Sequence, residues 1–220
     1  MSTNFDRVAF VYDRLAKLIF GRSTHAAQDC FLEEVPLSAS VLILGGGSGR
    51  VLTELLSRKP AAKITYLEAS QAMVDLTKER LMDWPEAKVK LIKGTEQYLT
   101  KDHYQFDVVI TQFVLDVYKP KQLEQAITLL DKCLKPNGKW IFADFRLSAH
   151  WYHRWWQWLL VKTMYIFFSI TTNIEANCLL DFSSHLLAIG WKSKKSKKFY
   201  SGMIIAEVLQ KAYPPTDPSH

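Results

Sequence analysis

The segment from residue 41 to residue 57 constrains the fold most, because an apolar run, a glycine-rich loop and an amphipathic stretch follow one another without a break. Residues 41–44 have the wholly apolar, branched composition of a buried parallel strand. Glycine occupies four of positions 45–49, and the apolar residues of 50–57 then recur at helical spacing. A strand, a glycine loop and a helix in this order place unpaired backbone N–H groups and the positive end of the helix dipole at the carboxyl edge of a sheet. Such an edge can hold a nucleotide.

Strands and helices alternate along the rest of the chain. Runs rich in β-branched residues, which favour strands, occupy residues 64–67, 89–92, 107–111 and 139–145. Helical periodicity covers 4–20, closed by Gly21, then 71–82 with Ser70 as N-cap, 120–133 and most of 148–189. Lys135-Pro136-Asn137-Gly138 predicts a turn before the strand at 139–145. The pattern predicts an α/β fold with a mainly parallel sheet covered by helices.

The end of the chain predicts an antiparallel hairpin. Its strands, 191–200 and 203–209, are separated by Ser201-Gly202, a link too short for a crossover connection. With 220 residues and 48% hydrophobic content, the chain is expected to form one domain over residues 1–212. Residues 213–220 are predicted to be a disordered tail.

The cysteines and the apolar runs favour a cytoplasmic protein. The three cysteines are widely spaced, with no CxxC pair and no metal-ligand spacing, which fits a reducing compartment. Charged residues interrupt the first twenty positions, so no signal peptide is predicted. The longest apolar run, 155–170, has 16 residues, contains Gln157 and Lys162, and is shorter than the roughly 20 residues that span a bilayer.

Glu68 adds a second nucleotide-binding feature. It ends the strand after the glycine loop, 19 residues beyond Gly49, where a carboxylate can accept hydrogen bonds from both hydroxyls of a ribose. A dinucleotide oxidoreductase would need a small residue where this chain has Arg50, and no YxxxK pair is present. The loop fits G-x-G-x-G better, although an oxidoreductase remains an alternative.

The chain resembles the class I S-adenosylmethionine-dependent methyltransferases, particularly the ubiquinone and menaquinone C-methyltransferase branch. The resembling stretches, in the order and spacing of that family, are 5–7, 11–15, 41–49, 67–70, 94–96, 106–109 and 134–139. The resemblance implies a Rossmann-like, seven-stranded sheet of order 3-2-1-4-5-7-6 with the last strand antiparallel. It also implies that S-adenosylmethionine lies across the carboxyl ends of the first four strands and leaves as S-adenosylhomocysteine.

The resemblance also assigns cofactor-binding residues one by one. Gly45, Gly46, Gly47 and Gln112 are expected beside the methionine part, Glu68 at the ribose, Ala69 and Met73 beside the adenosine, Thr95 and Glu96 beside the adenine, and Tyr12 closing over the cofactor. Two positions depart from the family pattern. Ile43 stands where an acidic residue is usual, so the methionine ammonium needs another partner or water, and Asp116 stands where many relatives carry His or another polar residue.

Catalysis of methyl transfer can come largely from alignment and exclusion of water, because the sulfonium is already a strong electrophile. No single catalytic residue is therefore assigned. If the acceptor must lose a proton, the candidate bases near the mouth of the site are Tyr12, Asp116, His150 and His153. His150 and His153 lack a third ligand nearby, so no metal site is expected.

An aromatic segment is expected to cover the substrate side. Residues 151–168 hold eight aromatic side chains within a predicted lid at about 148–175. They favour a small, aromatic or lipophilic methyl acceptor. The alternatives are core packing, a dimer contact, or an interfacial helix that touches a membrane to reach a lipid or quinone.

The net charge of +6 is mostly one strip of five lysines, Lys192, Lys194, Lys195, Lys197 and Lys198. In the implied topology they lie on an edge strand, where lysines prevent association between sheets. Arginine is absent from the strip, so no nucleic-acid partner is predicted. Two questions stay open: whether the chain is a monomer or a homodimer, and whether it is a catalytically inactive protein that binds the cofactor.

Overall fold

A computed structural model describes residues 22–101, 104–146, 186 and 189–211. Several predictions lie outside these residues: the helix at 4–20, the aromatic lid at 148–175 and the tail at 213–220. The extent of the single domain over 1–212 therefore stays a prediction.

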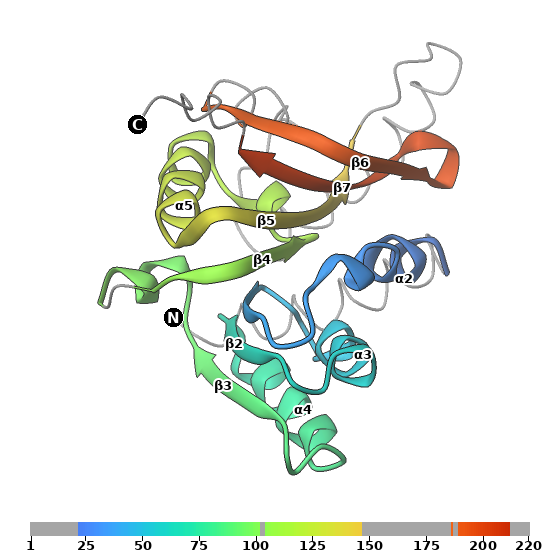
Figure 1. Cartoon of the computed structure of the whole chain (residues 1–220), viewed down its shortest axis with the longest axis vertical. Coiled ribbons are helices and arrows are strands. Elements are labelled where there is room, and N and C mark those ends of the chain that lie inside the picture. The colour runs from blue at the N-terminus through green and yellow to red at the C-terminus, as the bar shows by residue number, and fades with distance from the viewer. Residues whose placement is uncertain (1–21, 102–103, 147–185, 187–188, 212–220) are drawn as a thin grey trace, which may run out of the picture.

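The core of the protein is one seven-stranded sheet of order β3-β2-β1-β4-β5-β7-β6 (Figure 1). The strands are β1 Ser40–Leu44, β2 Lys63–Glu68, β3 Lys88–Lys93, β4 Phe106–Gln112, β5 Leu134–Phe145, β6 Trp191–Phe199 and β7 Ile204–Lys211. The first five run parallel, and β7 is antiparallel to both β5 and β6. The predicted fold class, strand order and final hairpin are confirmed.

Helices pack against this sheet. They are α2 Arg22–Asp29, α3 Arg50–Arg58, α4 Gln71–Leu81 and α5 Pro120–Lys132, and short 3-10 turns lie at Leu32–Glu34, Glu96–Lys101, Leu115–Val117 and Tyr200–Gly202. Alternate strand residues enter two apolar clusters: Val41 and Ile43 pack with α3, whereas Leu42 and Leu44 pack with α5. This period of two is why the apolar strand is buried on both faces.

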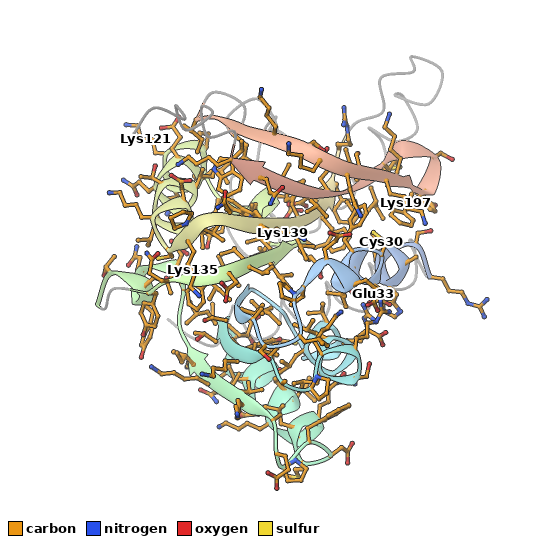
Figure 2. All side chains as sticks on the ribbon, viewed as in Figure 1. Cys30, Glu33, Lys121, Lys135, Lys139 and Lys197 are labelled. Atoms are coloured by element: carbon orange, nitrogen blue, oxygen red, sulfur yellow. The ribbon has the colours of Figure 1, made fainter. Side chains whose placement is uncertain are left out.

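Helix α2 was not predicted, because its sequence has no apolar stripe and buries only Thr24 and Ala27. It packs against β6 and β7, and Figure 2 labels Cys30, just beyond its end, near Lys197 of β6. Burial raises the pKa of the Cys30 thiol to about 11, while the charge of Lys197 opposes that shift. Cys30 and Cys133 are both free thiols.

The predicted start of the fifth strand, Lys139, was wrong. Strand β5 begins at Leu134, which pairs with Phe106, and pairing resumes at Lys139 opposite Val108. The Pro-Asn-Gly stretch that predicted a turn is a bulge inside the strand, with Asn137 at a φ of 65°. The turn residues were recognised correctly, but not the pairing on their N-terminal side.

The predicted position of the lysine strip is confirmed. Strand β6 is the edge of the sheet, and its residues 192–198 are all exposed. Within the described part of the chain, no helix is long and apolar enough to cross a membrane.

Candidate functional site

The glycine loop between β1 and α3 is held in a conformation that only small residues fit. Gly45 has a φ of +65°, and a Cβ there would lie 2.3 Å from Cγ2 of Val114. A Cβ on Gly46 would lie 2.5 Å from the Tyr66 ring. Gly47 has a φ of +63°, yet a Cβ there would meet no atom within 4 Å. Gly45 and Gly46 are thus required for packing, whereas Gly47 borders open space.

Side chains from β2 and α4 hold the Gly47 peptide from both sides. Its N–H donates to Oε2 of Glu68 at 3.0 Å, and its carbonyl accepts the hydroxyl of Tyr66 at 2.8 Å. The hydroxyl of Thr77 lies 3.1 Å from the same carbonyl and 2.8 Å from the carbonyl of Met73. The loop is therefore ordered by the protein itself.

Glu68 ends β2 beside this loop and is 8% exposed. Its Oε1 accepts the N–H of Ser70 at 2.9 Å, while Oε2 binds Gly47. Burial raises the pKa of Glu68, and the hydrogen bonds from backbone N–H groups partly oppose that shift. Each carboxylate oxygen still has lone-pair capacity for another donor, such as a hydroxyl.

The other predicted positions around β2 and β3 are described too. Met73 is buried in the first turn of α4, where Ser70 accepts its N–H and is the predicted N-cap. Ala69 is half-buried and Thr95 is exposed. Glu96 is 8% exposed and accepts a hydrogen bond from the hydroxyl of Tyr118. Burial and the Glu96 carboxylate raise the pKa of Tyr118.

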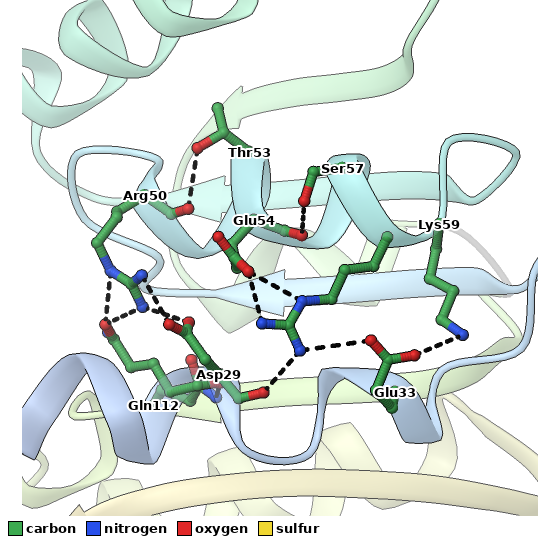
Figure 3. Close-up of polar contacts among 10 residues, drawn as sticks. Asp29, Glu33, Arg50, Thr53, Glu54, Ser57, Lys59 and Gln112 are labelled. Atoms are coloured by element: carbon green, nitrogen blue, oxygen red, sulfur yellow. Dashed lines mark hydrogen bonds and ion pairs between the residues drawn. The ribbon is translucent and has the colours of Figure 1, made fainter.

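Gln112, the last residue of β4, is 5% exposed and linked to α2 (Figure 3). Its Nε2 donates to the carbonyl of Gln28 at 2.8 Å. Its Oε1 is buried and has no hydrogen-bond partner among the residues that the structure describes. Because β4 lies beside β1, Gln112 follows the strand position that pairs with Leu44 and so lies next to the glycine loop.

The segment after β4 runs over the glycine loop and carries Asp116, which forms an acidic pair with Asp144 of β5. Val114 packs on Gly45, and Phe113 has a left-handed φ of 56° and packs on Phe145 with ring centroids 5.0 Å apart. Asp144, at the end of β5, is 4% exposed and accepts the N–H of Phe145 at 2.9 Å. Burial, together with the nearby charge of Asp116, raises the pKa of Asp144 well above its usual range.

The structure thus brings together the glycine loop, Glu68, Gln112 and Asp116 at the carboxyl edge of the sheet. Three predicted residues, Tyr12, His150 and His153, lie outside the described residues. Ile43, which stands where an acidic residue is usual in the family, is buried in an apolar cluster. This position therefore offers the cofactor no carboxylate. Among the residues that the structure describes, no cluster of three metal-ligating side chains occurs.

Sequence reasoning missed Tyr118, Asp144 and Gln28. Tyr118 and Gln28 lie outside the segments whose spacing predicted a helix or a strand, so no signal in the sequence could have found them. Asp144 gave a weak signal, because it is a lone acidic residue at the end of an apolar strand.

A family model described as "Methyltransferase domain" matches residues 41–138. Among curated proteins, malonyl-[acyl-carrier protein] O-methyltransferase from Priestia megaterium is 34% identical over 107 residues, which are 48% of this chain and 36% of that protein. Polyamine aminopropyltransferase from Aeropyrum pernix is 32% identical over 119 residues, 49% of this chain and 38% of that protein. Demethylmenaquinone methyltransferase from Chlamydia pneumoniae is 24% identical over 136 residues, which are 61% of this chain and 56% of that protein.

The matched parts are therefore about a third to about half of these relatives' own lengths. Among solved structures, a SAM-dependent methyltransferase from Aquifex aeolicus superposes with a TM-score of 0.56 at 15% identity. That alignment covers 87% of this chain and 93% of the other. At such low identity, the likeness shows a shared fold.

Proposed function

Residues 41–138 of this chain belong to a family of methyltransferase domains, and from this premise we propose that the protein is an enzyme that methylates a small acceptor with S-adenosylmethionine. The carrying observation is the contact between Glu68 and the glycine loop. A buried carboxylate that accepts the backbone N–H groups of Gly47 and Ser70 lies beside Gly47, where open space adjoins the backbone.

The described residues fit an adenosyl ligand that carries an amino-acid group. Glu68 would accept the two ribose hydroxyls, as acidic residues at this position of nucleotide-binding sheets do. Gly47 leaves room for the ligand to approach the backbone, since a Cβ at this position would meet no atom within 4 Å. The buried Oε1 of Gln112 offers an acceptor on the other side of β1.

When bound, the sulfonium of S-adenosylmethionine supplies an activated methyl group for in-line displacement. The protein's contribution is then to orient the two reactants and to exclude water. Tyr66 and Thr77 hold the loop in place before any ligand binds. Of the candidate bases, Asp116 is the one that lies among the described residues, and it would take the proton from an acceptor that must lose one.

The acceptor that we propose is a small, aromatic or lipophilic molecule. The support is compositional: eight aromatic side chains occur within residues 151–168. A cytoplasmic setting is also part of this proposal, since Cys30 and Cys133 are free thiols. Contact of 151–168 with a membrane stays an open prediction, and flotation with lipid vesicles tests it.

Calorimetric titration tests the choice of cofactor. We expect the full chain to bind S-adenosylmethionine and S-adenosylhomocysteine but not NAD. Glu68→Ala should weaken both by about tenfold or more, because a buried hydrogen-bonding group is lost. Glu79→Ala, at an exposed position of α4, is the matched control and should change neither. The proposal fails if neither sulfur ligand binds, or if Glu68→Ala retains full affinity.

Aminopropyl transfer is the second candidate, because a relative at 32% identity is named a polyamine aminopropyltransferase. Polyamines are cations, and the carboxyl groups of Asp116 and Asp144 lie close enough to interact electrostatically, after β4 and at the end of β5. An acceptor panel that includes putrescine distinguishes the two activities by their nucleoside product. Methyl transfer from S-adenosylmethionine releases S-adenosylhomocysteine, whereas aminopropyl transfer from its decarboxylated form releases 5′-methylthioadenosine. Binding of the cofactor without release of either product would indicate an inactive cofactor-binding protein.

A further inference from the structure

A bulge in β6, the edge strand of the sheet (Figure 1), gathers lysines on one face. Ser193 lies opposite Leu209 of β7. The next pair along the strands joins Lys195 to Val208, so Lys194 is an extra residue between the two pairs. Because side chains alternate along a strand, one extra residue moves the side chains that follow it to the opposite face. One face of β6 therefore carries both serines, and the other face, here termed the basic face, carries Lys192, Lys195, Lys197 and Phe199.

The basic face lies on the side of the sheet that packs against α2. Residues that lie directly opposite each other in an antiparallel pair point to the same side. Lys197 lies opposite Ala206, which packs with Ala27 of α2. Lys198 lies opposite Ile205, which belongs to the apolar cluster of α5. The neighbours Lys197 and Lys198 thus point to opposite sides of the sheet.

Glu34 balances only part of the charge on this side. Its carboxylate accepts Nζ of Lys195 from β6 and, at 3.0 Å, Nζ of Lys139 from β5. Lys192 and Lys197 form no ion pair with any residue that the structure describes. Residues 192–198 are all exposed. The basic face therefore presents unbalanced positive charge to the solvent.

The basic face ends in an aromatic ring at the carboxyl edge of the sheet, where the candidate functional site lies. Phe199 lies opposite Ile204, which in turn lies opposite Phe145 at the end of β5. Phe199 is half-buried, and Nζ of Lys197 lies 5.4 Å from the centroid of its ring. Ammonium groups beside an aromatic ring suit the headgroup level of a lipid bilayer, where both kinds of side chain are enriched.

The kind of cation narrows the choice of partner. A lysine ammonium is a compact point charge that is attracted to a diffuse negative surface, whereas arginine recognises single phosphates through paired hydrogen bonds. Strand β6 has no arginine, and no aromatic side chain lies between its lysines on which bases could stack. These features favour the surface of an anionic bilayer over a nucleic acid.

We propose that the basic face of β6 docks the protein on the surface of an anionic lipid bilayer, with Phe199 at the level of the headgroups. The contact is electrostatic and superficial. It brings the carboxyl edge of the sheet close to the bilayer, which would suit a lipophilic acceptor. The proposal depends neither on the cofactor nor on residues 151–168.

Cosedimentation of the full chain with lipid vesicles tests the proposal. We expect binding to vesicles of phosphatidylcholine with phosphatidylglycerol and none to vesicles of phosphatidylcholine alone. Binding should fall as NaCl is added, because salt screens the attraction. A run without lipid subtracts any protein that pellets through self-association.

A double variant tests whether β6 supplies the charge. Each lysine close to an anionic surface contributes about fivefold to the partition coefficient, so Lys192→Gln combined with Lys197→Gln should weaken binding by about 25-fold. The matched control combines Lys78→Gln with Lys132→Gln, which removes the same charge from exposed positions on α4 and α5. It should bind like wild type.

Two single variants test which face docks. Lys197→Gln should weaken binding by about fivefold, whereas Lys198→Gln, at the next residue but on the other face, should bind like wild type. Equal losses in both would contradict docking through one face and assign the attraction to the strand's total charge.

The remaining outcomes each overturn the proposal. Failure to bind anionic vesicles, or equal binding to neutral ones, shows that no electrostatic docking occurs. Full binding by the double variant of Lys192 and Lys197 assigns the contact to another segment, such as 151–168. If single-stranded DNA displaces the protein from the vesicles, the partner of the basic face is a nucleic acid.

Discussion

At the scale of single residues, the protein orders its glycine loop with side chains instead of relying on a ligand. The Gly47 carbonyl lies within hydrogen-bond distance of two hydroxyls, and its N–H binds a carboxylate. Each of these side chains comes from β2 or α4, so the loop is fixed once these elements pack. Loop ordering therefore requires little further loss of entropy when a ligand binds.

The two hydroxyls at the Gly47 carbonyl provide a first prediction. Tyr66→Phe and Thr77→Val should each lower the free energy of unfolding by about 0.5–1.5 kcal/mol. The double variant should lose more than the sum, since the carbonyl then lacks both donors. Urea denaturation measures this, with Thr128→Val as control because the Thr128 hydroxyl donates to the Glu124 carbonyl of its own helix. Strictly additive losses would show that the hydroxyls do not share the carbonyl.

A second prediction concerns pH and Asp144. Burial and the charge of Asp116 raise the pKa of Asp144 in the folded protein, so the folded state binds the proton more tightly than the unfolded state. The stabilisation from this proton is full below the ordinary Asp pKa, about 3.9, and is lost as pH rises through the raised value. Wild type should therefore lose stability relative to Asp144→Asn as pH increases through this window.

Urea denaturation of both proteins at a series of pH values measures the difference. Asp83→Asn, at an exposed position, is the control and should run parallel to wild type. A constant difference between wild type and Asp144→Asn across the series would contradict the prediction.

At the scale of elements, the sequence predicted most of the sheet because its strands carry their own signal. The apolar runs at β1 and β4 are buried on both faces, so composition alone marks them. Helix α2 has no such signal, because Arg50 holds it through Gln28 and Asp29 and not through an apolar stripe. The bulge in β5 was missed because pairing of Leu134 with Phe106 is a tertiary property.

The candidate site likewise has contacts that the sequence predicts and contacts that it does not. The glycine loop and Glu68 belong to one strand-loop-helix-strand unit, so their spacing along the chain predicts their meeting. The contact of Tyr118 with Glu96 and that of Asp144 with the segment after β4 join residues far apart in sequence. Such contacts depend on how strand ends approach one another, which periodicity does not encode.

The third prediction belongs to strand β6. Lys192, Lys194 and Lys198 are exposed on the edge of the sheet, where an uncharged strand would expose backbone groups to another edge. Replacing all three by Thr should increase self-association in sedimentation velocity. Replacing Lys78, Lys121 and Lys132, exposed on helices, removes the same charge and should not. Equal association of both variants would assign the effect to net charge alone.

At the scale of the whole molecule, strand order places the site. The chain continues from β1 to β2 on one side of the sheet and from β4 to β5 on the other, so the strand order changes direction between β1 and β4. A crevice at such a switch of direction is where open α/β sheets bind ligands. Glu68, the glycine loop and Gln112 follow β2, β1 and β4 in turn, so a ligand there contacts three strands at once.

A ligand that binds across these strands should stabilise the whole fold, which gives the fourth prediction. At a concentration about 100 times its Kd, a ligand adds about 2.7 kcal/mol to the free energy of unfolding. For a domain of this size each kcal/mol raises Tm by about 2–4 °C, so S-adenosylhomocysteine should raise it by about 5–10 °C. NAD at the same concentration should leave Tm unchanged, and so should S-adenosylhomocysteine with Glu68→Ala if that variant's Kd exceeds the concentration used. A shift with NAD alone, measured by calorimetry, would instead indicate the oxidoreductase alternative, because Tm responds to whichever ligand the folded crevice holds.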